Sequence, residues 1–179
     1  MRFRTPISAA AVLTLTLGCQ SGETLVSEHQ HQMNPAVSAK VSGEIKADVA
    51  RLRALVAALH PLGAAQDAGF VAAASPCVAS PAGGMGFHWA NPGRVDATVQ
   101  WDEPEILVFA PNPDAADEVK LGAVEYIVPK ALSATPPTLF EETFVEGGPG
   151  NTLWTLHVWI GIENPAGLFA PWNPRVVCS

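Results

Sequence analysis

The hydrophobic residues of this chain change their spacing near residue 77, and this change constrains the fold more than any other feature. Upstream, apolar residues recur at the three- and four-residue steps of an amphipathic helix. They are Ile45, Val49, Leu52, Val56 and Leu59. The pattern predicts a helix that begins near Ser42 and ends at His60-Pro61, followed by a shorter, alanine-rich helix over residues 62–74.

Downstream, short runs rich in Val, Ile, Phe and Trp alternate with turn residues, which predicts strands. The expected strands cover residues 85–90, 95–101, 105–110, 121–128 and 153–162. Two helices followed by strands indicate an α+β fold with a mainly antiparallel sheet or a partly open barrel. The connection 129–150, which is rich in Pro and Gly, is expected to be a long ordered loop beside any site.

The first eighteen residues have the pattern of a secretory signal peptide. Two arginines precede an apolar run over residues 7–17, which is shorter than the roughly 20 residues of a membrane span. Cys19 follows Gly18 as in a lipoprotein signal, although Thr16 stands where an aliphatic residue is usual. We therefore expect an exported protein. It is either attached to the outer membrane or cell surface by lipid on Cys19, or else secreted or periplasmic.

These features divide the chain into a signal peptide (residues 1–18), a lipid-anchor cysteine with a flexible tether (19–41) and one globular domain (42–179). The signal peptide holds two of the ten Lys and Arg residues and no acid, so its removal leaves 8 basic against 17 acidic residues. The resulting net charge of −9, without any basic run, argues against nucleic acid as a partner. Protein partners are not indicated by the sequence.

Cys77 and Cys178 are expected to form a disulfide. If Cys19 carries lipid, they are the only two thiols of the exported chain, and the cell envelope is oxidising. Ordinary signal processing would instead leave Cys19 as an odd thiol or remove it.

The alternation of side chains along a strand makes His88 a candidate site residue. In the strand 85–90, His88 shares its face with only Gly86 and Ala90, while the large apolar residues take the other face. Either a closely packed element or open space must therefore lie before its imidazole.

The same alternation places Thr155, His157 and Trp159 together, opposite the wholly apolar face of their strand. A few polar groups beside an aromatic ring are typical of a ligand pocket. The alternative is a half-exposed sheet face on which Trp159 covers a neighbouring strand.

Glu125 has apolar neighbours on both sides, and an ionised carboxylate there needs a partner if it is buried. Arg94, Arg175 or a histidine can supply that partner. The alternative is an outward-facing glutamate on an edge strand. Glu105, which follows Pro104 at a strand start, is expected to be exposed.

His88, His157 and Glu125 together form a candidate metal site, because two neutral imidazoles and a carboxylate are a common open set for zinc or another divalent ion. We expect the ring nitrogens of the two histidines to lie within about 4–8 Å of each other. A pocket that contains both histidines without a metal is the alternative.

Motifs of serine hydrolases, dinucleotide sites, phosphate loops, zinc proteases and haem attachment do not occur in the sequence. The leading hypothesis is a non-catalytic cell-envelope module that binds a small ligand or a metal ion. Its pocket is formed by His88, Glu125, Thr155, His157 and Trp159. The alternative is a metal-dependent enzyme of the hydrolase or lyase type, in which His88, His157 and Glu125 hold an ion that activates water or polarises a carbonyl.

Several short motifs between about residue 46 and Cys178 occur together. They are Met-Gly-x-His-aromatic at 85–89, Pro-Glu-x-Leu at 104–107, Val-Glu-Tyr at 124–126, Leu-His-Val-Trp at 156–159 and Trp-Asn-Pro at 172–174. In this combination the chain resembles an uncharacterised family of exported bacterial proteins of unknown function. Trp89 departs from the tyrosine that is common in that family. The resemblance implies one domain and no particular activity.

We predict that labelling of the protein with palmitate is lost in Cys19→Ser and that this variant is released in soluble form, because Cys19 is the expected site of lipidation. Metabolic labelling followed by membrane fractionation measures both effects. Incorporation unchanged by the substitution would show that the lipoprotein signal is not used.

Overall fold

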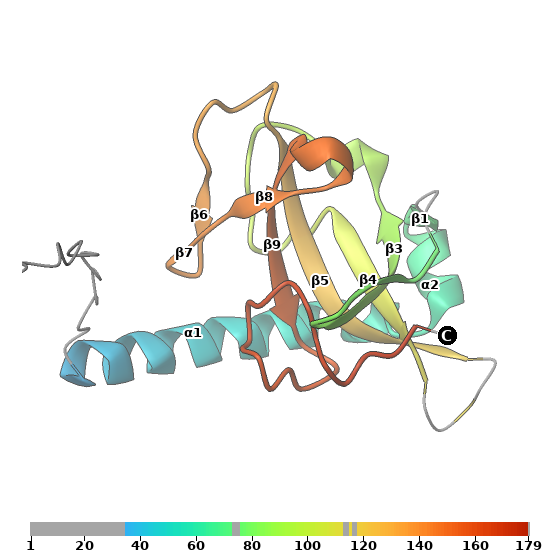
Figure 1. The fold of residues 1–179 in the computed structure, drawn as a ribbon, viewed down its shortest axis with the longest axis horizontal. Coiled ribbons are helices and arrows are strands. Elements are labelled where there is room, and N and C mark those ends of the chain that lie inside the picture. The colour runs from blue at the N-terminus through green and yellow to red at the C-terminus, as the bar shows by residue number, and fades with distance from the viewer. Residues whose placement is uncertain (1–34, 73–75, 113–114, 116–117, 179) are drawn as a thin grey trace, which may run out of the picture. The chain divides into compact units, whose positions relative to one another are not determined.

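The structure is a computed structural model, and it describes residues 35–72, 76–112, 115 and 118–178. The predicted signal peptide, Cys19 and the first part of the predicted tether lie outside the described residues. One main helix and an antiparallel sheet make up the fold (Figure 1). None of the described helices has both the length and the apolar character that a bilayer-spanning segment needs.

The main helix, α1 (Pro35–Val56), begins earlier than its apolar stripe predicts. Proline suits a first helical position because its missing N–H would have no partner there. Residues 35–41, which the sequence assigned to the tether, therefore belong to the helix, and Ser42 lies inside it. The predicted stripe is confirmed, since three of its residues are buried and the other two pack against the same core.

The second predicted helix is much shorter than residues 62–74. A 3-10 turn, η1 (Ala57–Leu59), follows α1, and α2 (Leu62–Asp67) is only six residues long. Gly69 has a φ of +88°, in the left-handed region that favours glycine and ends helices. The chain then enters the strand β1 (Val71–Ala72).

The main sheet is antiparallel, with its strands in the order β1-β3-β4-β5-β9-β8, and β2 pairs with the other end of β3. Its remaining strands are β2 (Val78–Ser80), β3 (Gly83–Ala90), β4 (Ile106–Pro111), β5 (Val119–Pro129), β8 (Val145–Gly147) and β9 (Leu153–Trp159). The predicted α+β class with an antiparallel sheet is thus confirmed. Because β1 and β8 lie at opposite edges, the sheet is open and the partly open barrel is not formed.

The two faces of the sheet are covered by different elements. α1 lies behind the sheet, and residues 160–178 cross in front of it (Figure 1). Alternation along each strand sends Leu107 and Val124 to the α1 face, whereas Ile106 and Val108 take the other face. We call residues 160–178 the covering segment, and its Val176 packs on that second face.

Glycines in β3 allow neighbouring backbone to approach closely. A Cβ atom on Gly83 would lie 2.4 Å from the carbonyl oxygen of Asn173, and one on Gly86 would lie 2.5 Å from that of Phe109. Gly84 and Asn173 exchange two backbone hydrogen bonds, which hold the covering segment on the sheet. The glycine-rich stretch therefore serves strand packing.

Residues 95–101, which were predicted as a strand, form a loop instead. Oδ1 of Asp96 accepts hydrogen bonds from both the backbone N–H and the hydroxyl of Thr98. Such local side-chain bonding competes with strand pairing.

The predicted long connection after β5 is ordered and contains short elements of its own. They are the hairpin strands β6 (Thr138–Leu139) and β7 (Glu142–Thr143), the edge strand β8, and a 3-10 turn, η3 (Pro149–Asn151).

The predicted disulfide is present. Cys77, just before β2, is bonded to Cys178 of the covering segment, and their Cα atoms lie 5.5 Å apart. The bond fixes this segment beside β2 and β3.

We predict that the double variant Cys77→Ala/Cys178→Ala loses about 2–5 kcal/mol in free energy of unfolding, because the disulfide links residues 101 positions apart. Urea denaturation of the oxidised wild type and of the variant measures the difference. Wild-type protein treated with a reductant is the control and should match the variant. An unchanged denaturation midpoint would contradict the prediction.

Candidate metal centre

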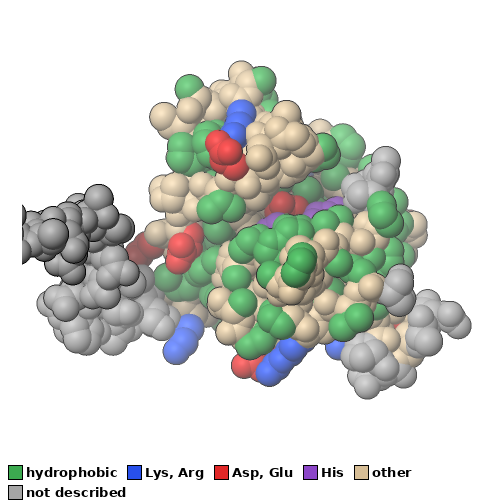
Figure 2. Space-filling model, in the orientation of Figure 1, with side chains coloured by type: hydrophobic (Ala, Val, Ile, Leu, Met, Phe, Trp, Pro, Cys, Tyr) green, Lys and Arg blue, Asp and Glu red, His purple; other side chains and the backbone are tan. Residues whose placement is uncertain are grey.

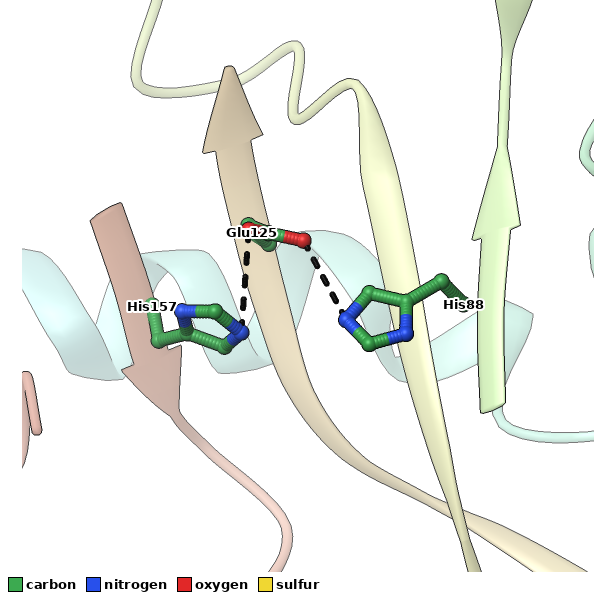
Figure 3. A group of neighbouring side chains, drawn as sticks. All are labelled: His88, Glu125 and His157. Atoms are coloured by element: carbon green, nitrogen blue, oxygen red, sulfur yellow. Dashed lines mark ion pairs between the residues drawn. The ribbon is translucent and has the colours of Figure 1, made fainter. Parts of the chain in front are cut away.

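His88, Glu125 and His157 come from three strands and lie on the face of the sheet opposite α1 (Figure 3). Glu125 of β5 pairs directly with His157 of β9. His88 of β3 pairs with Val108 of β4, so its side chain reaches across β4 toward Glu125. Both histidines thus lie on the strand face that the alternation of side chains predicted.

The carboxyl group of Glu125 lies between the two imidazoles. Its Oε2 is 3.4 Å from Nε2 of His88, and its Oε1 is 3.7 Å from Nε2 of His157. One possible ligand atom from each residue lies within 4.8 Å of the other two, which agrees with the expected close approach of the histidines. Ligands at about 2.1 Å from a tetrahedral ion are about 3.4 Å apart, so the ligand atoms would have to approach one another by up to about 1.4 Å to hold an ion.

Burial determines the ionisation of these groups. It raises the pKa of Glu125 to about 8, and the nearby carboxyl of Glu105 adds to the rise. Burial also lowers the pKa of His88 to about 4. The pKa of His157 is lowered to about 3 by burial and by its neighbour His88. Near pH 7 the three groups are therefore neutral, and an ionised Glu125 requires a cation beside it.

Nε2 of His157 is buried and has no hydrogen-bond partner, unlike every other buried side-chain nitrogen or oxygen among the described residues. Leaving such an atom unpaired typically costs about 1–3 kcal/mol. The atom points toward the carboxyl group of Glu125 (Figure 3). A buried nitrogen with a free position directed at a carboxyl oxygen has the arrangement that a metal ligand needs.

A cavity of about 640 Å³ adjoins the group. His88, Glu125 and Thr155 line it, together with apolar side chains from β3, β4 and β9. Further walls are formed by residues 145–149, by Asn151, and by Pro171 and Trp172 of the covering segment. Figure 2 shows histidine and acidic side chains at the base of this hollow.

Two residues of the predicted pocket do not line the cavity. His157 is buried beside Glu125, with 2% of its surface exposed. Trp159 packs in the apolar cluster under the covering segment, and its Nε1 donates a hydrogen bond to the carbonyl oxygen of Ala170. The prediction for Trp159 was wrong because alternation gives the face of a residue but not what covers it.

The histidines are the partners of Glu125, as one of the predicted alternatives required. Arg94 instead donates to the carbonyl oxygen of Pro104, and Arg175 pairs with Glu163. The alternative of an outward-facing glutamate on an edge strand is wrong, because β5 lies between β4 and β9.

Glu105 was expected to be exposed, but only 2% of its surface is accessible. Its Oε2 accepts a hydrogen bond from the backbone N–H of Ile127 at 3.1 Å. Burial raises the pKa of Glu105 to about 7, although the hydrogen bond from the backbone N–H of Ile127 opposes the rise. Asp96 and Arg94 have smaller effects on this pKa, of opposite sign. A glutamate between a proline and an apolar strand carries no local signal of this burial.

Comparisons of the chain with protein-family models, with curated proteins and with solved structures find no match. The resemblance to a family of exported bacterial proteins therefore stays a prediction.

We predict that Glu105→Gln becomes more stable relative to the wild type as the pH rises. The folded-state pKa of Glu105 lies above its ordinary value, so its stabilising contribution is complete below about pH 4.5 and is lost as the pH rises through about 7. The glutamine keeps an acceptor for Ile127 and does not titrate, so the difference in free energy of unfolding should grow by about 2–3 kcal/mol between pH 4.5 and 8.

Urea denaturation of both proteins across this range measures that difference. Glu103→Gln, at an exposed position two residues earlier, is the matched control. If the difference in free energy of unfolding between the two proteins does not change with pH, the raised pKa of the buried Glu105 is contradicted.

Proposed function

We propose that this chain is an exported cell-envelope protein, anchored by lipid on Cys19, that binds a divalent first-row metal ion through His88, Glu125 and His157. Zinc is the first candidate, because two imidazole nitrogens and one carboxylate oxygen are donors that zinc accepts readily. The proposal places the chain in the exported bacterial family that it resembles.

The convergence of the three donors carries this proposal. Their ligand atoms lie within 4.8 Å of one another, and among the described residues only the two histidines lie within ion-pairing distance of Glu125. No lysine or arginine pairs with Glu125 among those residues, so its carboxylate form needs another cation. Nε2 of His157, which is buried and makes no hydrogen bond, is a further atom whose lone pair an ion would engage.

A small ligand joins the ion in this proposal. Three protein ligands leave a fourth position on a tetrahedral ion. His88 and Glu125 line the cavity, so that position is accessible to a molecule in it. The disulfide between Cys77 and Cys178 supports an oxidising compartment such as the cell envelope.

The same open position supports the second candidate, a zinc-dependent hydrolase or lyase that uses His88, His157 and Glu125. Such an enzyme also needs a group that transfers a proton or stabilises developing charge. The remaining charged residue that lines the cavity in the described chain is Glu146, and it pairs with Lys130 at 2.6 Å. We therefore favour binding. Zinc-dependent ester hydrolysis that is lost in His88→Ala would favour the enzyme instead.

We predict that the full-length protein binds one zinc ion per chain and that His88→Ala weakens this binding by more than about 100-fold. Loss of an outer hydrogen-bond partner of a metal ligand already costs about 10–100-fold, and loss of the ligand itself should cost more. Metal analysis after desalting gives the stoichiometry, and competition with a chelating dye gives the affinity.

His60→Ala is the matched control, because His60 is an exposed histidine outside the group. It should bind zinc as the wild type does. Thermal unfolding shows whether each variant remains folded. A folded His88→Ala variant with wild-type zinc affinity would overturn the proposed function.

A further inference from the structure

The cavity beside the candidate metal centre is apolar over most of its surface. His88 and Glu125, whose side chains approach to 3.4 Å, mark its polar end, next to the metal centre. The other polar residues of the lining, within the described chain, are Glu146, Asn151 and Thr155. The apolar walls come from several elements and include Val78, Met85, Ile106, Leu153, Pro171 and Trp172. A molecule that fits this surface is amphipathic, with one polar group at the end of an apolar body.

The volume limits the size of the molecule. The cavity has a volume of about 640 Å³, within the roughly 300–1,000 Å³ that is typical of sites for small organic molecules. Burial of such a molecule would remove apolar surface from water at about 25 cal/mol per Å².

The charges at the polar end select the head group. A divalent ion held by two neutral imidazoles and one carboxylate has a single uncompensated positive charge. No lysine or arginine is among the described residues that line the cavity. Glu146, whose side chain is 56% exposed, is already paired with Lys130. A group with one negative charge is therefore neutralised at this end, whereas a phosphate monoester would bring a second charge without a partner.

We infer that the cavity binds a small amphipathic monocarboxylate, whose carboxylate occupies the open position of the ion and whose hydrocarbon part lies against the apolar walls. This inference rests on the proposed metal site. Both parts of the molecule are required, because the carboxylate supplies charge neutralisation and ligation, and the hydrocarbon part supplies apolar burial.

Titration calorimetry of the zinc-loaded full-length protein with octanoate, 1-octanol and acetate tests the inference. Octanoate has both parts, 1-octanol lacks the charge and acetate lacks the apolar body. We expect octanoate to bind once per chain and the other two compounds to bind at least tenfold more weakly. Equal binding of octanoate and 1-octanol, or of octanoate and acetate, would overturn the inference.

A pair of variants tests whether the hydrocarbon part lies in this cavity. Val145 lines the cavity and is 53% exposed, so Val145→Asp adds a negative charge to the wall without disturbing a buried position. It should weaken octanoate binding at least tenfold and leave zinc binding unchanged. Val177→Asp is the matched control, because Val177 is also exposed but is not among the residues that line the cavity. Equal octanoate affinity in the two variants would overturn the inference.

Zinc binding is measured separately, so the two proposals fail in different ways. Zinc binding without selective octanoate binding overturns only the inference that the cavity binds a monocarboxylate. Absence of zinc binding overturns the proposed function, and the inference with it. Octanoate that binds equally well to zinc-free and zinc-loaded protein would overturn ligation of the carboxylate by the ion.

Discussion

Burial of a carboxyl group in the middle of the sheet is the constraint on which the rest of the structure depends. Glu125 lies in β5, between β4 and β9, and only 6% of its surface is exposed. An unpaired carboxylate there would cost several kcal/mol, so near pH 7 the group is protonated unless a cation lies beside it. His88 and His157 reach the carboxyl group from two other strands, and their convergence depends on the register of the sheet. A slip of one residue in β9 would turn His157 into the core beneath α1.

The two layers that cover the sheet differ in kind, and the cavity results from this difference. α1 covers one face with a continuous apolar stripe. The other face is covered by the irregular segment 160–178, which uses buried asparagines to satisfy its own backbone. Asn164 donates to the carbonyl oxygen of Trp172, and Asn173 accepts from the backbone N–H of Arg175. This segment packs over Trp159 but only borders the histidine and glutamate group, so that end of the sheet remains open.

The sequence predicted the properties that depend on local alternation. The face taken by His88 and His157 follows from their own strands, whereas the apolar neighbours of Glu125 left both a buried and an outward-facing carboxyl group open. The covering of Trp159 and the burial of Glu105 depend on segments far away in the chain, and no local pattern contains them. Convergence of the three donors likewise requires the strand order, which alternation does not give.

Two errors in the predicted elements have local causes. Gly69 ends α2 although the apolar pattern continues, because its positive φ interrupts the helix. Asp96 turns the following residues into a loop by bonding to Thr98, although Val, Trp and Thr there favour a strand. In both places a specific backbone requirement outweighs hydrophobic spacing.

The attachment of the covering segment determines the order in which the hollow can assemble. β3, β4 and β5 follow one another in sequence, with connections of 15 and 7 residues (91–105 and 112–118). Gly84 meets Asn173, and Cys77 meets Cys178, across about 90–100 residues. Contacts of such separation form late, since the entropy of closing the loop is lost before the contact stabilises it. We therefore expect His88 and Glu125 to come together before the last wall docks, and an ion or organic molecule to have access to the site during that interval.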